Sequence, residues 1–125
     1  MYNNYKKLNY QNNEVMLSGR ELEAHILTKM SNKLRTCKKD WENKEILMKV
    51  LEENQLLWSI FQENMENDDC TQPNNIRLNI LRLIKFIDTR TFQIMSNELP
   101  DADSMDMLID INNSIAKGLR THKEE

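Results

Sequence analysis

Residues 46–65 read ILMKVLEENQLLWSIFQENM, with apolar side chains at steps of three or four positions along the whole run. This spacing places the apolar side chains on one stripe of an α-helix. Only Asn54 interrupts the stripe, whose apolar members are Ile46, Leu47, Val50, Leu51, Leu57, Trp58, Phe61 and Met65. Because such a stripe is stable only when it is buried against other helices, the run predicts the central helix of a helical core.

A similar helical stripe precedes this run. Its members are Leu22, Ile26, Met30, Leu34 and Cys37. They predict a helix from about residue 18 to 38, with Ser18 as its N-cap and Glu21 at the capping-box position. Asp40 follows, and we expect it to cap the central helix.

Two further helices are predicted after Pro73, at about 74–97 and about 104–119. The inner face of the first is formed by Ile76, Ile80, Leu83, Ile84, Ile87, Thr91 and Ile94. The stripe of the second is formed by Met105, Leu108, Ile109, Asn112, Ile115, Ala116 and Leu119. We expect Asp103 or Ser104 to cap this last helix, Asp106 to lie in its first turn, and Gly118 to mark its C-terminal end.

The scarcity of turn residues agrees with this assignment. The 125-residue chain contains only two glycines and two prolines, whereas a sheet protein of this length needs many tight turns. The sequence therefore predicts an all-α protein: a single small bundle of about four helices over residues 18–119. A polar N-terminal tail (1–17) and a short charged C-terminal tail (120–125) are expected to flank it.

The sequence offers little for catalysis or metal binding. No two glycines are close enough for a phosphate loop, and Cys37 and Cys70 are isolated from each other and from histidine. The acids at 101–106 do not fit a calcium loop, because Met105 occupies a ligand position. We expect no enzyme, no cofactor and no metal. Without an apolar signal segment or a membrane-length apolar run, a cytoplasmic protein with reduced thiols is expected.

Charge alternates along the chain, although the net charge is only −3. Residues 1–40 carry eight Lys or Arg against four Asp or Glu, and residues 41–75 carry two against eight. This pattern is typical of neighbouring helices that complement each other, and nucleic acid is not the expected partner. A basic face formed by Lys29, Lys33, Arg82 and Lys85 could nevertheless hold RNA phosphates, so RNA binding is kept as an alternative.

Asn54 and Asn112 are the two amides that interrupt apolar stripes. A buried amide has to find hydrogen-bond partners, which here could be the other amide, a loop backbone or a second protein. Trp58 and Phe61, close to Asn54, fit either a core or the floor of a groove that accepts a partner helix. The candidate partner-binding residues are Asn54, Leu57, Trp58, Phe61 and Asn112.

Four stretches, in order along the chain, resemble one protein family. They are residues 18–24 (SGRELEA), 54–61 (NQLLWSIF), 79–91 with Asn79-Ile80-Leu81, Phe86-Ile87 and Thr91, and 108–119 (LIDINNSIAKGL). The second is similar to the family signature N-x-x-L-W-x-x-F, and the last resembles its closing segment. The family is FlaF, the flagellar biosynthesis regulator of alphaproteobacteria.

This resemblance implies a cytoplasmic protein that is needed for flagellin production and filament assembly. It also implies flagellin as the main partner and the FlbT regulator as a second one. We therefore expect binding of a flagellin helix by the five candidate residues. The alternatives are RNA binding and an adaptor role, in which the acidic residues Glu52, Glu53 and Glu63 form the docking surface.

Overall fold

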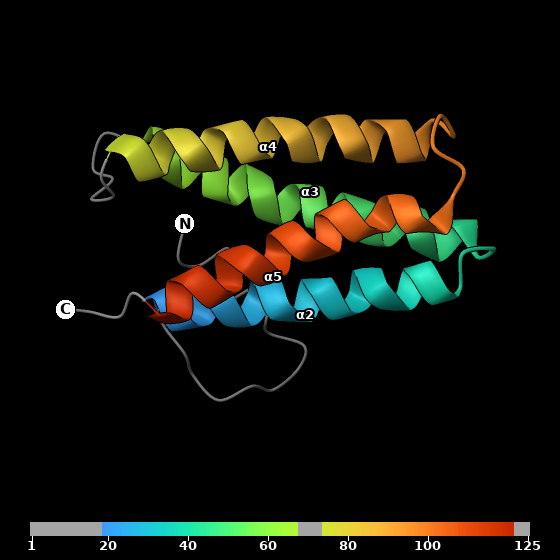
Figure 1. Ribbon diagram of the computed structural model, residues 1–125, viewed down its shortest axis with the longest axis horizontal. Coiled ribbons are helices and arrows are strands. Elements are labelled where there is room, and N and C mark those ends of the chain that lie inside the picture. Colours follow the sequence, from blue (N-terminus) through green and yellow to red (C-terminus); the bar gives the residue numbers. More distant parts are fainter. Residues whose placement is uncertain (1–18, 68–73, 122–125) are drawn as a thin grey trace.

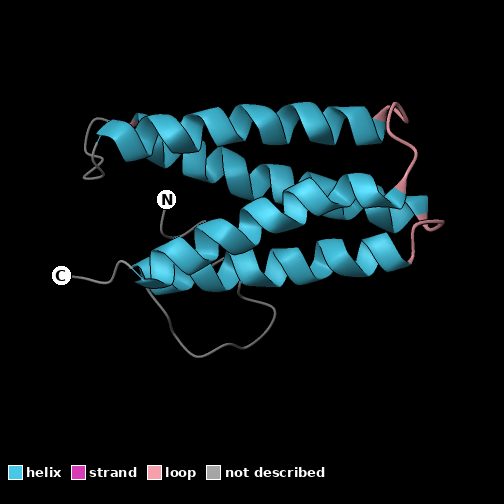
Figure 2. Cartoon of the chain, in the orientation of Figure 1, coloured by secondary structure: helices cyan, strands magenta, loops and turns pink. Residues whose placement is uncertain are grey.

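The computed structural model describes residues 19–67 and 74–121. Within these ranges the chain forms helices and loops but no strand (Figure 2). The elements are α2 (Gly19–Lys39), α3 (Lys44–Glu66), α4 (Asn74–Met95), the 3-10 helix η2 (Ala102–Met105) and α5 (Asp106–Thr121). The predicted all-α bundle of about four helices is confirmed. The expected tail at 1–17, the Ser18 cap, the segment 68–73 and residues 122–125 lie outside the described residues.

The helices are arranged as two pairs (Figure 1). α2 and α5 lie side by side, α3 and α4 form the second pair, and α2 also packs on α3. α4 forms one edge of the bundle and packs mainly on α3, and no other described helix covers its far side (Figure 1). This edge position leaves one long face of α4 without a helical neighbour among the described residues.

Asparagines set two helix boundaries that the sequence prediction placed differently. The side chain of Asn43 caps α3 by accepting a 3.3 Å hydrogen bond from the Ile46 amide, so the prediction of Asp40 as the cap is wrong. α4 ends at Met95 because Asn97 adopts a left-handed conformation with φ of 64°. The amide of Glu98 then donates to the Gln93 carbonyl at 2.8 Å, as in a Schellman motif.

The last helix begins with a 3-10 turn. The Ser104 hydroxyl donates a 2.7 Å hydrogen bond to the Asp101 carbonyl within this turn, so neither Asp103 nor Ser104 is the N-cap of α5. Asp106 does lie in the first turn of α5, as predicted. Gly118 lies inside α5, which continues to Thr121, so this glycine does not end the helix and the helix extends beyond the predicted boundary at 119.

The core is built mainly from the predicted stripes, with Leu27 of α2 as an unpredicted member. The predicted members that are only half-buried are Ile80, Leu83, Ile115 and Leu119, and the side chain of Ile76 lies outside the described residues. In α3, every member of the stripe is buried except Ile46, which is 49% exposed. The fully buried large side chains from all four helices include Leu22, Leu27, Leu34, Leu47, Leu51, Leu57, Trp58, Ile87, Met105 and Leu108. This continuous core, rather than helix propensity, is the main source of stability for helices of this length.

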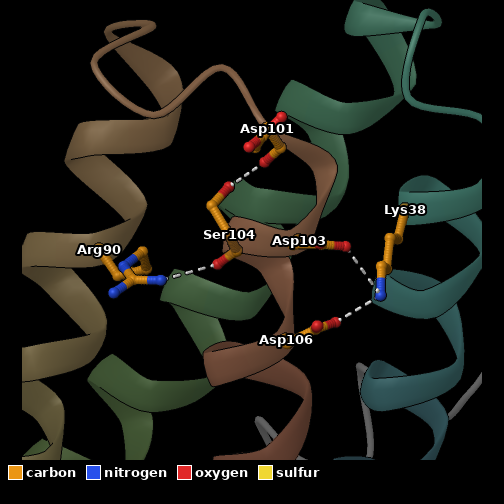
Figure 3. A network of polar contacts seen from close by, with 6 residues as sticks. All are labelled: Lys38, Arg90, Asp101, Asp103, Ser104 and Asp106. Atoms are coloured by element: carbon orange, nitrogen blue, oxygen red, sulfur yellow. Dashed lines mark hydrogen bonds and ion pairs between the residues drawn. The ribbon is translucent and has the colours of Figure 1, made fainter.

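The connection from α4 to α5 is tied to its neighbours by polar contacts at one end of the bundle (Figure 3). Arg90 of α4 donates a 3.1 Å hydrogen bond to the Ser104 carbonyl, and Lys38 of α2 forms a 2.8 Å ion pair with Asp106. A second Lys38 contact reaches Asp103 at 3.4 Å, and the Trp41 indole donates to the Pro100 carbonyl at 2.8 Å. These contacts hold α4 in register with α2 and α5.

Candidate partner-binding surface

The structure brings the five predicted partner-binding residues together inside the core. The exposed fractions are 0% for Asn54, Leu57 and Asn112, 1% for Trp58 and 6% for Phe61. Because the stripe of α3 faces the other helices, none of these side chains is presented to a partner in this conformation. Any direct contact with a second protein would require the bundle to open.

Three of these residues form a buried chain of hydrogen bonds between α3 and α5. The Trp58 Nε1 donates to Asn112 Oδ1 at 2.8 Å, and Asn112 Nδ2 donates to Asn54 Oδ1 at 2.8 Å. Asn112 thus uses both ends of its amide, which satisfies an otherwise costly buried group. The sequence left three kinds of partner open for the two asparagines: the other amide, a loop backbone or a second protein. In the structure the two amides are hydrogen-bonded to each other.

Aromatic packing completes this part of the core. The rings of Trp58 and Phe61 meet edge to face, with centroids 5.1 Å apart and planes inclined by 75°. Such a pair adds about 0.5–1.5 kcal/mol beyond the burial of its area. The tryptophan side chain is therefore fixed both by packing and by its hydrogen bond to Asn112.

Two polar atoms of fully buried side chains, one within this chain of hydrogen bonds and one on α4, have no protein partner. They are the Nδ2 of Asn54 and the Oγ1 of Thr91, both on side chains that are 0% exposed. A buried hydrogen-bonding group without a partner costs about 1–3 kcal/mol. The core therefore contains two polar groups, one at the α3–α5 contact and one on α4, that lower its stability.

The four residues of the RNA alternative do not form one surface. Lys29 and Lys33 lie on α2, whereas Arg82 and Lys85 lie on α4 at the opposite edge of the bundle (Figure 1). Lys33 forms a 3.1 Å ion pair with Glu53 of α3, as expected for neighbouring helices of opposite charge. Arg82 and Lys85 are exposed, and Arg82 donates a hydrogen bond to the Asn79 side chain at 3.4 Å.

The acidic residues of the adaptor hypothesis are divided in the same way. Glu52 and Glu63 are exposed on α3, while Glu53 is half-buried and paired with Lys33. Only two of the three carboxylates are therefore available on the surface. The exposure of Glu52 and Glu63 neither supports nor contradicts a docking role, so the adaptor hypothesis stays a prediction.

The outer face of α4 carries large apolar side chains that the stripe analysis did not single out as exposed. Leu78 is 52% exposed, Phe86 58% and Phe92 63%. At about 100° per residue these three lie within an arc of about 120°, opposite the arc that contains Ile87 and Thr91. α4 is thus apolar on both sides, and only its inner side is used by the core.

Two basic residues share that outer arc. Arg82 and Lys85 fall between Phe92 and Phe86 in helical projection, and within the described residues neither forms an ion pair. We call the five residues Leu78, Arg82, Lys85, Phe86 and Phe92 the outer face of α4. The sequence signal that could have revealed it is the presence of apolar residues off the main stripe, between basic ones.

The described residues contain no group of three or more metal-ligating side chains. Cys37 is a free, buried thiol in the core. Burial raises its pKa, and the negative charges of Asp40 and Glu53 raise the pKa further. Because the thiolate is the reactive form, this cysteine is a poor nucleophile in the folded protein.

A comparison with models of protein families shows to which family the chain belongs. The family described as flagellar protein FlaF matches residues 5–119, so the chain belongs to the FlaF family. Searches of curated proteins and of solved structures found no match. Among the described helices, none has the length and apolar character required to cross a membrane.

Proposed function

We propose that this chain acts in the cytoplasm, where it binds flagellin. Through this binding it supports flagellin synthesis, export or filament assembly. Membership of a flagellar protein family supports the flagellar part of the proposal. The observation that carries the binding part is the apolar outer face of α4, because soluble monomers rarely leave several large apolar side chains on one helix face without a partner.

A binding protein suits the architecture better than an enzyme does. The buried residues complete a helical core, and the exposed apolar side chains lie on a long helix at the edge of the bundle. Helical partners commonly dock on such surfaces through side chains at successive turns. We propose no catalytic role, cofactor or metal.

The direct test is a calorimetric titration of the full chain with purified monomeric flagellin. The proposal predicts saturable binding with a 1:1 stoichiometry at concentrations of about 50 µM or below. An absence of heat and of a mobility shift in gel filtration at that concentration would contradict it. The FlbT regulator, added to the same titration, shows whether the chain also acts as an adaptor.

RNA binding remains a second candidate because the outer face of α4 combines basic and aromatic side chains, the two kinds of group that hold single-stranded nucleic acid. This candidate predicts affinity for flagellin leader RNA that falls steeply with salt. Binding that is absent, or insensitive to salt, would remove it. Only Arg82 and Lys85 of the original four basic residues lie on this face.

A further inference from the structure

We propose that the outer face of α4 is the docking site for a single amphipathic partner helix whose apolar stripe is bordered by Asp or Glu residues. This inference rests on the proposed function and specifies which surface of this chain binds and what chemistry the bound segment has. Phe86 and Phe92 are the apolar anchors, and Arg82 and Lys85 provide the charge that selects an acidic helix.

The exposure of the two phenylalanines has no explanation within the bundle. α4 already contributes Ile84, Ile87 and Ile94 to the core, with exposed fractions of 3%, 0% and 4%. Phe86 and Phe92 point away from this inner stripe and remain 58% and 63% exposed. Single exposed apolar residues are ordinary, but two phenylalanines and a leucine that share one arc of the same helix are more than a single exposed residue.

The length of the outer face fits a helix. Leu78 and Phe92 are separated by 14 residues, which corresponds to about 21 Å along α4. A partner helix of about four turns would cover this distance. The edge position of α4 leaves room for such a helix beside it (Figure 1).

Of the four basic residues of α4, two contact the rest of the bundle and two lie on the outer face. Arg77 donates to the Met65 carbonyl at 2.8 Å and Arg90 to the Ser104 carbonyl at 3.1 Å, so both serve the bundle. Arg82 and Lys85 lie on the outer face and have no ion-pair partner among the described residues. Their positive charge complements carboxylates on the partner and disfavours a basic one.

The same charges argue against a second copy of the chain at this site. In a symmetric antiparallel contact between two α4 helices centred between Arg82 and Lys85, Arg82 of one copy would face Lys85 of the other. Like charges brought together in this way oppose association. A different protein with an acidic, apolar helix therefore fits the outer face better than self-association does.

Two double variants of the full chain test the site by titration with purified flagellin. In Phe86→Ser with Phe92→Ser the anchors are lost, and in Arg82→Glu with Lys85→Glu the charge is reversed. We expect each to weaken flagellin binding by about tenfold or more, while Leu56→Ser, at the similarly exposed Leu56 of α3 (52%), binds as the unmodified chain does. Thermal unfolding of all variants should remain close to that of the unmodified chain, because every substituted side chain is exposed.

The outcomes separate the inference from the proposed function. If the unmodified chain binds flagellin and both double variants bind equally well, the inference is wrong and the proposed function stands. If the unmodified chain does not bind flagellin, the proposed function fails, and a designed peptide helix with a leucine stripe bordered by glutamates decides the inference. Binding of that peptide, with no binding of the same peptide carrying lysines in place of glutamates, supports the inference. Equal binding of the two peptides, or no binding of either, overturns it. A dimer of the chain that is disrupted by the phenylalanine double variant also overturns it.

Discussion

The indole of Trp58 donates a 2.8 Å hydrogen bond to the side-chain oxygen of Asn112, across 54 positions of sequence and between helices α3 and α5. The side-chain nitrogen of Asn112 donates in turn to Asn54, so a chain of polar side chains lies within an otherwise apolar core. Residues that resemble interface anchors in the sequence therefore fix the packing of the bundle. We therefore place the proposed partner on the outer face of α4.

The two asparagines should differ in importance. Asn112→Leu leaves the Trp58 N–H and the Asn54 Oδ1 without partners, at about 1–3 kcal/mol for each. Asn54→Leu leaves only Asn112 Nδ2 without its acceptor and removes an Nδ2 that already lacks a partner. We expect Asn112→Leu to lower the free energy of unfolding by about 2 kcal/mol more than Asn54→Leu in urea titrations. Asn113→Leu, at a half-buried neighbour, is the matched control, and equal losses at 54 and 112 would contradict the assignment.

Thr91 offers a stabilising substitution. Its hydroxyl is buried without a protein partner, so Thr91→Val replaces a costly polar group with a methyl group of similar shape. We expect the free energy of unfolding to rise by about 1 kcal/mol. The control is Thr89→Val, two residues away and exposed on the same helix, which should change little. A loss of stability for Thr91→Val alone would show that the hydroxyl is hydrogen-bonded in solution.

Cys37 should be protected in the folded state. In a chain carrying Cys70→Ser, the remaining thiol should react with a disulfide reagent far more slowly in buffer than in urea, because Cys37 is 4% exposed and its pKa is raised by burial. The raised pKa also predicts a direction for stability. The thiol's contribution is complete below the ordinary pKa of 9.0 and is lost as the pH rises through the higher folded value.

The measurement is the difference in urea midpoint between Cys70→Ser and the double variant Cys37→Ala with Cys70→Ser. The advantage of the chain that retains Cys37 should shrink above pH 9.0, where the unfolded thiol ionises. A constant difference from pH 7 to pH 11 would show that the thiol is not perturbed.

The contribution of Lys38 to stability should be lost at a higher pH than that of Cys37. Its hydrogen bond to Asp106 raises its pKa, with desolvation opposing this and the charges of Asp106 and Asp103 adding to it. The contribution of the contact is therefore complete below the ordinary value of 10.5 and is lost as the pH rises through the raised pKa. The stability difference between the unmodified chain and Lys38→Met should persist at pH 9 and shrink toward pH 12. The same difference at both pH values would show that the ion pair of Lys38 with Asp106 does not contribute to stability.

The helices and most of the buried residues could be predicted because they follow from local periodicity. The stripe of α3 repeats at helical spacing, and eight of its nine predicted members, all but Ile46, are buried. Boundaries were less predictable. The left-handed Asn97 and the cap at Asn43 depend on backbone geometry that several nearby polar residues could have adopted.

The candidate site was harder to predict, because one sequence pattern serves two roles. The periodicity of α3 places Trp58 on an apolar stripe but does not say whether that stripe meets another helix of the chain or a second protein. The answer comes from Asn112, a residue that no local pattern connects to Trp58. In α4, the isoleucine stripe concealed the second apolar face, because Phe86 and Phe92 do not form a continuous stripe of their own.

The most direct test of the central claim is an NMR titration of the isotope-labelled chain with unlabelled flagellin. The account predicts that the ring signals of Phe86 and Phe92 shift on binding, whereas the indole N–H of Trp58 keeps its position because its hydrogen bond to Asn112 stays closed. Unchanged phenylalanine signals together with a large shift of the Trp58 indole would contradict the account, because they would place the partner in an opened core.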